Sequence, residues 1–383
     1  MSESNIPLVD LGIAHRRVAE QVAAGFAEVL ENTSFILGPQ VKRFEEDFAR
    51  YSDSSYCVGV GNGTDAIELA LRACEIGPGD EVIIPANTFV ATAEAVERAG
   101  AKVVLADITD DYLIDPASVA GRITPATRAV VGVHLFGQMA PMTALREVVG
   151  PDVILIEDAA QSQGARQNGQ RSGSFGQAAA TSFYPGKNLG AYGDAGAVLT
   201  SDQAVAERLQ AVRNHGGIRK YEHEHFGFNS RLDSLQAVVL SAKLAVLDDW
   251  NDERRAAAAF YTELLADVQG VDLPVTAPGN EHVWHLYVVA VDDRDRVLAE
   301  LNGAGIGAGI HYPAPVHSVP AFAHLGYSTG DFPVSERASG RIVSLPLFPG
   351  ITEEQQLRVA DAVRVAVVKV SALEPAASNQ RGR

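Results

Sequence analysis

Three short segments contain side chains that could take part in a reaction or bind a ligand. One of these segments has a lysine between two apolar stretches. Lys187 lies in the turn-rich residues 181–190, Thr-Ser-Phe-Tyr-Pro-Gly-Lys-Asn-Leu-Gly. A lysine that is removed from water has a lowered pKa, and its amine becomes a nucleophile able to form a Schiff base. The alternative is a loop lysine that points into water, which is the default interpretation of this segment alone.

The second segment ends in an acidic residue. Residues 153–157 are predicted to be a strand, and Asp158 follows them, before the small residues Ala159 and Ala160. In an open parallel sheet, ligands bind outside the carboxyl ends of the strands. A carboxylate in a partly buried cleft there favours a protonated ring nitrogen opposite it. A structural aspartate that hydrogen-bonds to the next helix is the alternative, and this segment alone favours that alternative.

The third segment is a glycine-rich turn, residues 61–65 (Gly-Asn-Gly-Thr-Asp), between a predicted strand and a predicted helix. Glycines permit close approach of the backbone, Thr64 offers a hydroxyl, and a helix start presents unpaired N–H groups to an anion. The turn is therefore a candidate site for one phosphate. It matches neither the Walker A pattern nor Gly-x-Gly-x-x-Gly, so an ordinary turn capped by Asn62 or Thr64 is the alternative.

Short apolar strands that alternate with amphipathic helices must position these residues. The predicted strands cover residues 56–60, 81–85, 102–107, 128–134, 153–157, 181–184 and 195–200, with helices at 64–73, 89–98 and 142–149. This alternation is typical of an α/β fold, in which a mostly parallel sheet is covered by helices on both faces. A longer helical pattern begins near Leu235 and is predicted to continue past Trp250.

The last third of the chain has a different pattern. Strands are predicted over residues 283–291 and 305–311, and helices over 294–301 and 352–368. We therefore expect a large domain over residues 1–250 and a smaller α+β domain over residues 251–383. The small, polar tail from about residue 374 is expected to be disordered.

Five motifs extend the pattern beyond these three segments. They are Gly-Asn-Gly-Thr-Asp-Ala at 61–66, Pro-Ala-Asn-Thr-Phe-Val-Ala-Thr at 85–92, Glu-Asp-Ala-Ala-Gln at 157–161, Ser-Phe-Tyr-Pro-Gly-Lys at 182–187 and Asn-Ser-Arg-Leu-Asp at 229–233. In order and spacing they resemble the pyridoxal-phosphate-dependent nucleotide-sugar aminotransferases of the DegT/DnrJ/StrS type, a branch of the aspartate aminotransferase fold. The resemblance covers residues 6–351 and implies the type I fold of pyridoxal-phosphate enzymes.

The resemblance implies a role for each residue that matches a family motif. Lys187 is implied to be the Schiff-base lysine, and Asp158 the partner of the cofactor's pyridinium nitrogen. The other implied cofactor contacts are a ring stack by Phe89, a contact of Gln161 with the ring's phenolic oxygen, and phosphate contacts by Gly63, Thr64 and Ser182.

The family also implies a homodimer with shared active sites, in which Asn229 reaches the cofactor phosphate of the other subunit. Four residues are implied on the substrate side. Tyr184 and the pair His311 and Tyr312 would lie against the sugar, and Lys220 would neutralise the pyrophosphate of the nucleotide. Core packing for the two tyrosines and a solvated charge for Lys220 are the alternatives, and the sequence favours neither side.

The implied activity is transfer of an amino group from L-glutamate to a nucleotide-linked 3-keto-6-deoxyhexose, with dTDP as the nucleotide. Pyridoxamine 5′-phosphate would be the intermediate form of the pyridoxal 5′-phosphate cofactor. Lysine rather than histidine at position 187 favours transfer over dehydration. The alternatives are a 4-keto-sugar aminotransferase of the same family and a cofactor-binding auxiliary or regulatory protein without turnover. A Rossmann dehydrogenase is disfavoured because Gly-x-Gly-x-x-Gly is missing.

Composition narrows the range of partners. The chain has 383 residues, with 31 Lys and Arg against 48 Asp and Glu, and a formal net charge of −17. That charge disfavours binding to nucleic acid or to an anionic membrane, and it leaves room for a local anion site. Two cysteines, no recognisable signal peptide and no long apolar run favour a cytoplasmic protein. No metal site is expected, because His223 and His225 lack the spacing of ligands on one helix face.

Overall fold

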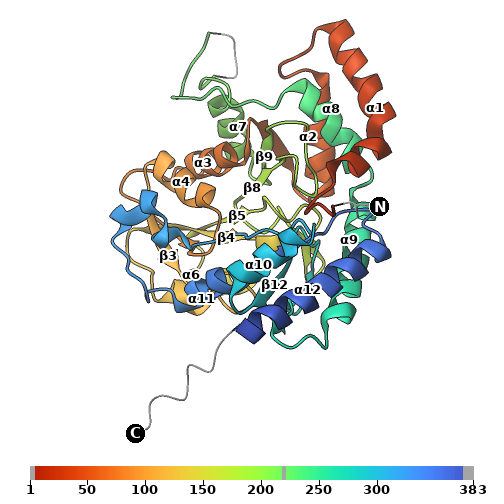
Figure 1. Ribbon diagram of the computed structural model, residues 1–383. Helices are drawn as coiled ribbons and strands as arrows, with labels where there is room; N and C mark the ends of the chain where they lie inside the picture. The colour runs from red at the N-terminus through yellow and green to blue at the C-terminus, as the bar shows by residue number, and fades with distance from the viewer. Residues whose placement is uncertain (1–4, 218–220, 374–383) are drawn as a thin grey trace.

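Apolar strands of five to seven residues form a central sheet in the computed structural model (Figure 1), which describes residues 5–217 and 221–373. The seven strands have the order β1-β9-β8-β5-β4-β2-β3, and β9 runs antiparallel to both of its neighbours while the other pairs are parallel. The strands are β1 (Tyr56–Val60), β2 (Glu81–Pro85), β3 (Lys102–Ala106), β4 (Thr127–Val133), β5 (Ile154–Asp158), β8 (Ala178–Ser182) and β9 (Gly196–Thr200). The mostly parallel α/β architecture predicted from the sequence is confirmed.

Helices cover both faces of the central sheet because successive side chains along a strand point to opposite faces. In β2, Val82 and Ile84 pack in the cluster that includes α3 and α4, whereas Ile83 packs in the cluster that includes α6. The helices of this part are α1 (Leu11–Asn32), α2 (Pro39–Tyr51), α3 (Gly63–Ala73), α4 (Val90–Ala99), α5 (Pro116–Ala120), α6 (Met142–Val149), α7 (Gln203–Val212) and α8 (Ser234–Leu244).

A second, antiparallel sheet lies in the C-terminal part, beside the blue helices of Figure 1. Its strands have the order β10-β12-β13, and its core includes Tyr261, Tyr287 and Leu345. The elements of this part are α9 (Leu247–Leu265), β10 (Val271–Asp272), β12 (Tyr287–Val291), α10 (Arg294–Gly303), α11 (Pro333–Arg341), β13 (Ile342–Leu345) and α12 (Glu353–Leu373). A small sheet of β6 (Arg166–Gln167), β7 (Gln170–Arg171) and β11 (Asn280–Glu281) joins the two parts.

Two predictions about individual elements are wrong. The single long helix is broken, since α8 ends at Leu244 and α9 begins at Leu247; α9 also spans the domain boundary expected after residue 250. The strand predicted over residues 305–311 forms only isolated bridges, Ile306 with Ile6 and Gly309 with Ser344. The positive φ of Gly305, +76°, turns the backbone out of an extended conformation there.

Three expectations, on membrane-spanning helices, Lys220 and the C-terminal tail, depend on which residues the structure describes. Within residues 5–217 and 221–373, no helix combines the length and apolar character needed to cross a bilayer. Lys220 and the tail from residue 374 lie outside the described residues.

Candidate active site

The amine of Lys187 and the carboxylate of Asp158 lie close enough to interact electrostatically, at the carboxyl end of the central sheet. The region around these two groups is called the cleft. Asp158 is the last residue of β5 and is buried, while Lys187 lies in the turn that follows β8. Desolvation lowers the pKa of Lys187 to about 8, and the negative charge of Asp158 opposes that shift. The parallel pairing of β5 with β8, Asp158 opposite Ala180, brings the two segments together.

Two hydrogen bonds orient the Asp158 carboxylate. Thr92 Oγ1 donates to Oδ2 at 2.8 Å, and the Ala160 N–H donates to Oδ1 at 3.2 Å. Thr92 also lies 2.8 Å from the Thr88 hydroxyl, which must then be the donor in that pair because the Thr92 proton goes to the carboxylate. Thr92 was missed in the sequence, although it lies in the first turn of α4, three residues after Phe89, the N-cap of that helix.

The glycine-rich turn ends at the start of α3, and its N–H groups are arranged to receive an anion. Gly63 and Thr64 are the first residues of this helix, and the Asn62 side chain caps it by accepting from the Asp65 N–H at 2.8 Å. A Cβ atom on Gly63 would lie 2.6 Å from the Ser182 Cβ, so only glycine permits this close approach. The structure thus brings Gly63, Thr64 and Ser182 to one helix start, where an anion is favoured.

Two aromatic side chains, Phe89 and Tyr312, lie together near Asp158. Phe89 is 49% exposed, and its ring centroid lies 5.0 Å from that of Tyr312. Gln161 accepts from the Phe136 N–H at 2.7 Å, which fixes its amide so that Nε2 donates to the Tyr312 hydroxyl at 3.0 Å. Burial raises the pKa of Tyr312, and the negative charge of Asp158 raises this pKa further. The Gln161 amide is therefore oriented with its N–H donors toward Tyr312.

The C-terminal part contributes a histidine to the same cleft. Burial lowers the pKa of His311 to about 4, and the positive charge of Lys187 acts in the same direction. The His311 Nδ1 lies 2.8 Å from Ser344 Oγ. Tyr184, by contrast, is 59% exposed, and its backbone N–H donates to Ser182 Oγ at 3.3 Å.

A second residue that the sequence did not single out, Asn188, fixes the chain next to Lys187. Its Nδ2 donates to Asn251 Oδ1 and to the Val283 carbonyl, each at 2.9 Å. Its Oδ1 lies 3.2 Å from His285 Nδ1. These contacts join the lysine turn to α9 and to the segment before β12, so the C-terminal part of the chain holds the lysine turn in place.

Asn229 lies on the surface and is placed differently from the residues above. It is exposed, and its backbone forms an isolated antiparallel bridge with Asn214. Its neighbour Ser230 contacts the glycine-rich turn: the Gly61 N–H donates to Ser230 Oγ at 3.0 Å. The Asn229 side chain is thus available to a neighbouring molecule.

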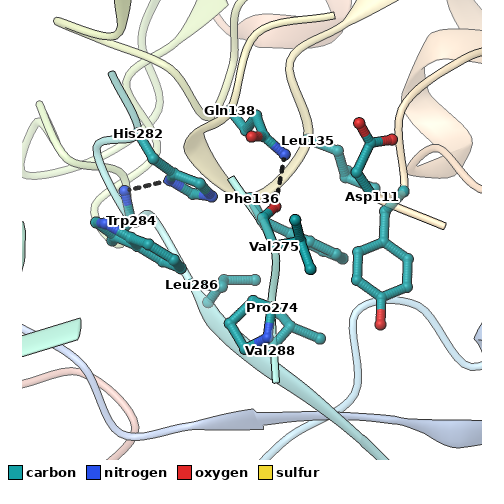
Figure 2. Close-up of a pocket in the computed structure, with 11 residues that line it drawn as sticks. Asp111, Leu135, Phe136, Gln138, Pro274, Val275, His282, Trp284, Leu286 and Val288 are labelled. Carbon is teal, nitrogen blue, oxygen red and sulfur yellow. Dashed lines mark hydrogen bonds between the residues drawn. The ribbon is translucent and has the colours of Figure 1, made fainter. Parts of the chain in front are cut away.

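A small cavity of about 10 Å³, the size of one water molecule, lies between the loop at Phe136 and the segment that precedes β12, lined in part by His282, Trp284 and Val275 (Figure 2). His282 and Trp284 stack with centroids 3.9 Å apart. The cavity's lining, taken from the described residues, contains no sequence-predicted site residue, so it is separate from the cleft at Lys187. Among the same residues, no group of three or more His, Cys, Asp or Glu is arranged to hold a metal ion.

The residues of the cleft fit pyridoxal 5′-phosphate. The start of α3 suits the phosphate, the buried carboxylate of Asp158 suits a protonated ring nitrogen, and the exposed face of Phe89 suits an aromatic ring. The partly desolvated amine of Lys187 suits an aldehyde.

Comparisons with known proteins point in the same direction. Residues 17–364 match the family model described as the DegT/DnrJ/EryC1/StrS aminotransferase family. A dTDP-3-amino-3,4,6-trideoxy-alpha-D-glucose transaminase from Streptomyces venezuelae is 46% identical over 94% of this chain and 95% of its own length. A pleiotropic regulatory protein from Geobacillus stearothermophilus is 45% identical over 94% of this chain and 98% of its own length. The crystal structure of DesV from S. venezuelae, in complex with a ketimine intermediate, superposes with a TM-score of 0.92 at 46% identity and covers 95% of this chain and 98% of that one.

Proposed function

Because the chain belongs to the DegT/DnrJ/EryC1/StrS aminotransferase family, we propose that it moves an amino group from L-glutamate to carbon 3 of a dTDP-linked keto-6-deoxyhexose. The chain is an aminotransferase that uses pyridoxal 5′-phosphate. The observation that carries the proposal is that the Lys187 amine lies close enough to the Asp158 carboxylate for the two to interact electrostatically. The name of the S. venezuelae relative, a dTDP-3-amino-sugar transaminase, supports both the nucleotide and carbon 3.

Lys187 supplies the amine that would bind the aldehyde of the cofactor, while glutamate supplies the amino group that is transferred. In our proposal the same Lys187 amine moves the proton between carbon atoms. Burial keeps its pKa near 8, so a substantial fraction of the amine is neutral and nucleophilic at physiological pH. When the amino donor displaces it, Lys187 Nζ accepts the proton from the α-carbon of glutamate. In each half of the reaction Nζ acts as a base and then as an acid. The cofactor, when bound, would carry the amino group and the proton between the two halves, and in the second half Nζ would deliver a proton to carbon 3 of the sugar.

Asp158 and the helix start hold the cofactor while Lys187 acts. The Asp158 carboxylate, oriented by Thr92, would keep a proton on the ring nitrogen opposite it. The N–H groups of Gly63 and Thr64 and the hydroxyl of Ser182 would bind the phosphate. The cofactor, when bound, supplies an aldehyde that carries the amino group and a ring that accepts the electrons released at the α-carbon.

The sugar would bind on the side of the cleft formed by Tyr184, His311 and Tyr312. His311 is directed into the cleft, as its interaction with Lys187 indicates, and the Tyr312 ring faces Phe89. The exposed Tyr184 ring offers an amphipathic surface for a sugar face. Lys220 would pair with the pyrophosphate; it lies outside the described residues, so its role rests on the resemblance alone.

A homodimer would complete the site through Asn229. Its neighbouring segments expose apolar side chains: Phe226 is 89% exposed, and Phe35 and Ile36 are 43% and 50% exposed. The backbone of Phe35 pairs with Ser234, which places these exposed residues beside the segment that carries Asn229. Exposed apolar side chains that gather in one region favour a protein contact. The proposal predicts a dimer in sedimentation experiments.

Absorption spectroscopy of the purified protein tests the proposed activity. A visible cofactor band should lose intensity when glutamate is added, and a dTDP-linked 3-keto-6-deoxysugar should restore it. The 4-keto isomer serves as the matched control and should restore the band much more slowly. Faster restoration by the 4-keto isomer would contradict carbon 3 as the site of amination and leave the aminotransferase assignment intact.

A regulatory protein without turnover is the second candidate, and the name of the G. stearothermophilus relative favours considering it. The presence of both Lys187 and Asp158 in the cleft argues for turnover, because mere cofactor retention does not require a nucleophilic amine. The same experiment separates the two: a band that responds to no amino acid would support the regulatory candidate.

A further inference from the structure

We propose that Ser230 is a positioning residue for the cofactor phosphate, because its hydroxyl joins the two ends of the glycine-rich turn. The Gly61 N–H donates to Ser230 Oγ at 3.0 Å, and the same hydroxyl donates to Asp65 Oδ2 at 2.7 Å. One side chain thus binds Gly61, which precedes α3, and Asp65, which lies in the first turn of α3. The inference deepens the proposed function and rests on it, since it needs a phosphate at this turn.

Ser230 is itself held firmly. It is 3% exposed, and its N–H donates to the Arg213 carbonyl at 3.0 Å. The Arg213 guanidinium in turn donates to Glu45 Oε1 at 2.5 Å and to the Gly59 carbonyl at 2.7 Å. These bonds fix the Ser230 hydroxyl relative to the end of β1. Side chains that are fixed in this way can orient the groups that bind a ligand.

The contact with Asp65 has an electrostatic consequence at this helix start. The Asp65 carboxylate lies in the first turn of α3, where a bound phosphate would place further negative charge. Its two oxygens are both occupied: Oδ2 accepts from Ser230, and Oδ1 accepts from Arg98 at 3.1 Å. These partners keep the carboxylate directed to the serine and the arginine, so the N–H groups of Gly63 and Thr64 at the helix start would receive the phosphate.

The position of Ser230 also separates its role from that of Asn229. In the proposed dimer, Asn229 serves the phosphate of the partner subunit, while Ser230, the next residue, supports the turn of its own subunit. Substitution of Ser230 should therefore change phosphate binding through the turn, without removing a group that contacts the phosphate.

The test compares two ligands that differ only by the phosphate group. The full-length protein, freed of cofactor, is titrated with pyridoxal 5′-phosphate and with pyridoxal, and the visible band reports binding. Ser230→Ala should bind pyridoxal 5′-phosphate about tenfold more weakly, as expected for the loss of two hydrogen bonds, and should bind pyridoxal as the wild type does. Ser241→Ala, a matched removal of a hydroxyl from α8, should bind both ligands as the wild type does.

Three other outcomes would overturn the inference. Unchanged affinity of Ser230→Ala for pyridoxal 5′-phosphate would show that the hydroxyl does not support the phosphate site. An equal loss for both ligands would show a general disturbance of the fold in place of a phosphate-specific one. If the wild-type protein formed no band with either ligand, the proposed function itself would fail, and the role of Ser230 would fail with it.

Discussion

His282 should make the folded protein markedly less stable in acid, and a single substitution should remove that effect. Its imidazole is buried and stacks on the Trp284 ring, and its Nδ1 accepts a hydrogen bond from the backbone N–H of Trp284 at 2.8 Å (Figure 2). Desolvation lowers the pKa of His282 to about 3 from its ordinary value of 6.5. Below pH 6.5 the unfolded chain therefore binds a proton that the folded chain excludes.

The size of the effect follows from these two pKa values. The stabilisation by neutral His282 is fully present above pH 6.5 and is lost progressively as the pH falls toward 3. Between pH 8 and pH 5, protonation of the unfolded chain at this one site costs about 2 kcal/mol of folding free energy, close to the limiting slope of about 1.4 kcal/mol per pH unit below pH 6.5.

The assay is urea unfolding followed by circular dichroism at pH 8 and pH 5, at one fixed protein concentration. In His282→Asn, the amide oxygen can still accept the Trp284 N–H, but the side chain no longer titrates. The variant should be less stable than the wild type at pH 8 because the ring stack is lost, and the difference should shrink by about 2 kcal/mol at pH 5. An equal pH dependence in both proteins would show that burial does not exclude a proton from His282, and that water in the adjoining cavity solvates its charged form.

The remaining predictions concern catalysis, the substrate and the core. Lys187→Gln should abolish turnover yet retain cofactor after dialysis, measured by absorbance; turnover at the wild-type rate would disprove its role. Lys220→Ala should raise the KM for the nucleotide sugar at physiological salt, and an unchanged KM would exclude the pyrophosphate contact. Glu157→Gln should lower the free energy of unfolding by about 3 kcal/mol, because the buried carboxylate accepts from His134 Nε2 and from the Gly173 N–H, each at 2.8 Å, and an amide cannot satisfy every such donor. A variant as stable as the wild type in urea would contradict this. The pKa of Glu157 reflects the same contacts. Burial alone would raise this pKa, but the hydrogen bonds from His134 and from the backbone outweigh burial and lower it.

Local patterns were sufficient for the strands and helices that carry the cleft. The strand at residues 81–85 and the helix at 142–149 were predicted at the bounds that the structure has. The predicted continuous helix near Trp250 was wrong because apolar spacing continues across the break at Ala245 and Val246, where one residue leaves the helical conformation. The prediction of a strand at residues 305–311 was wrong because a strand needs a partner strand along its length. In this segment only Ile306 and Gly309 pair, as isolated bridges with Ile6 and Ser344.

Sequence alone was enough to single out the candidate reactive residues: a lysine in the turn-rich residues 181–190, an aspartate at a strand end and a helix start suited to phosphate, all within family motifs. The tertiary structure decided what surrounds them. Thr92 meets Asp158 across 66 residues, Gln161 meets Tyr312 across 151, and Ser230 meets Asp65 across 165. Such contacts join separate elements, and local periodicity carries no information about which elements become neighbours. Burial, which lowers the pKa of Lys187, likewise depends on how the whole chain packs around that amine.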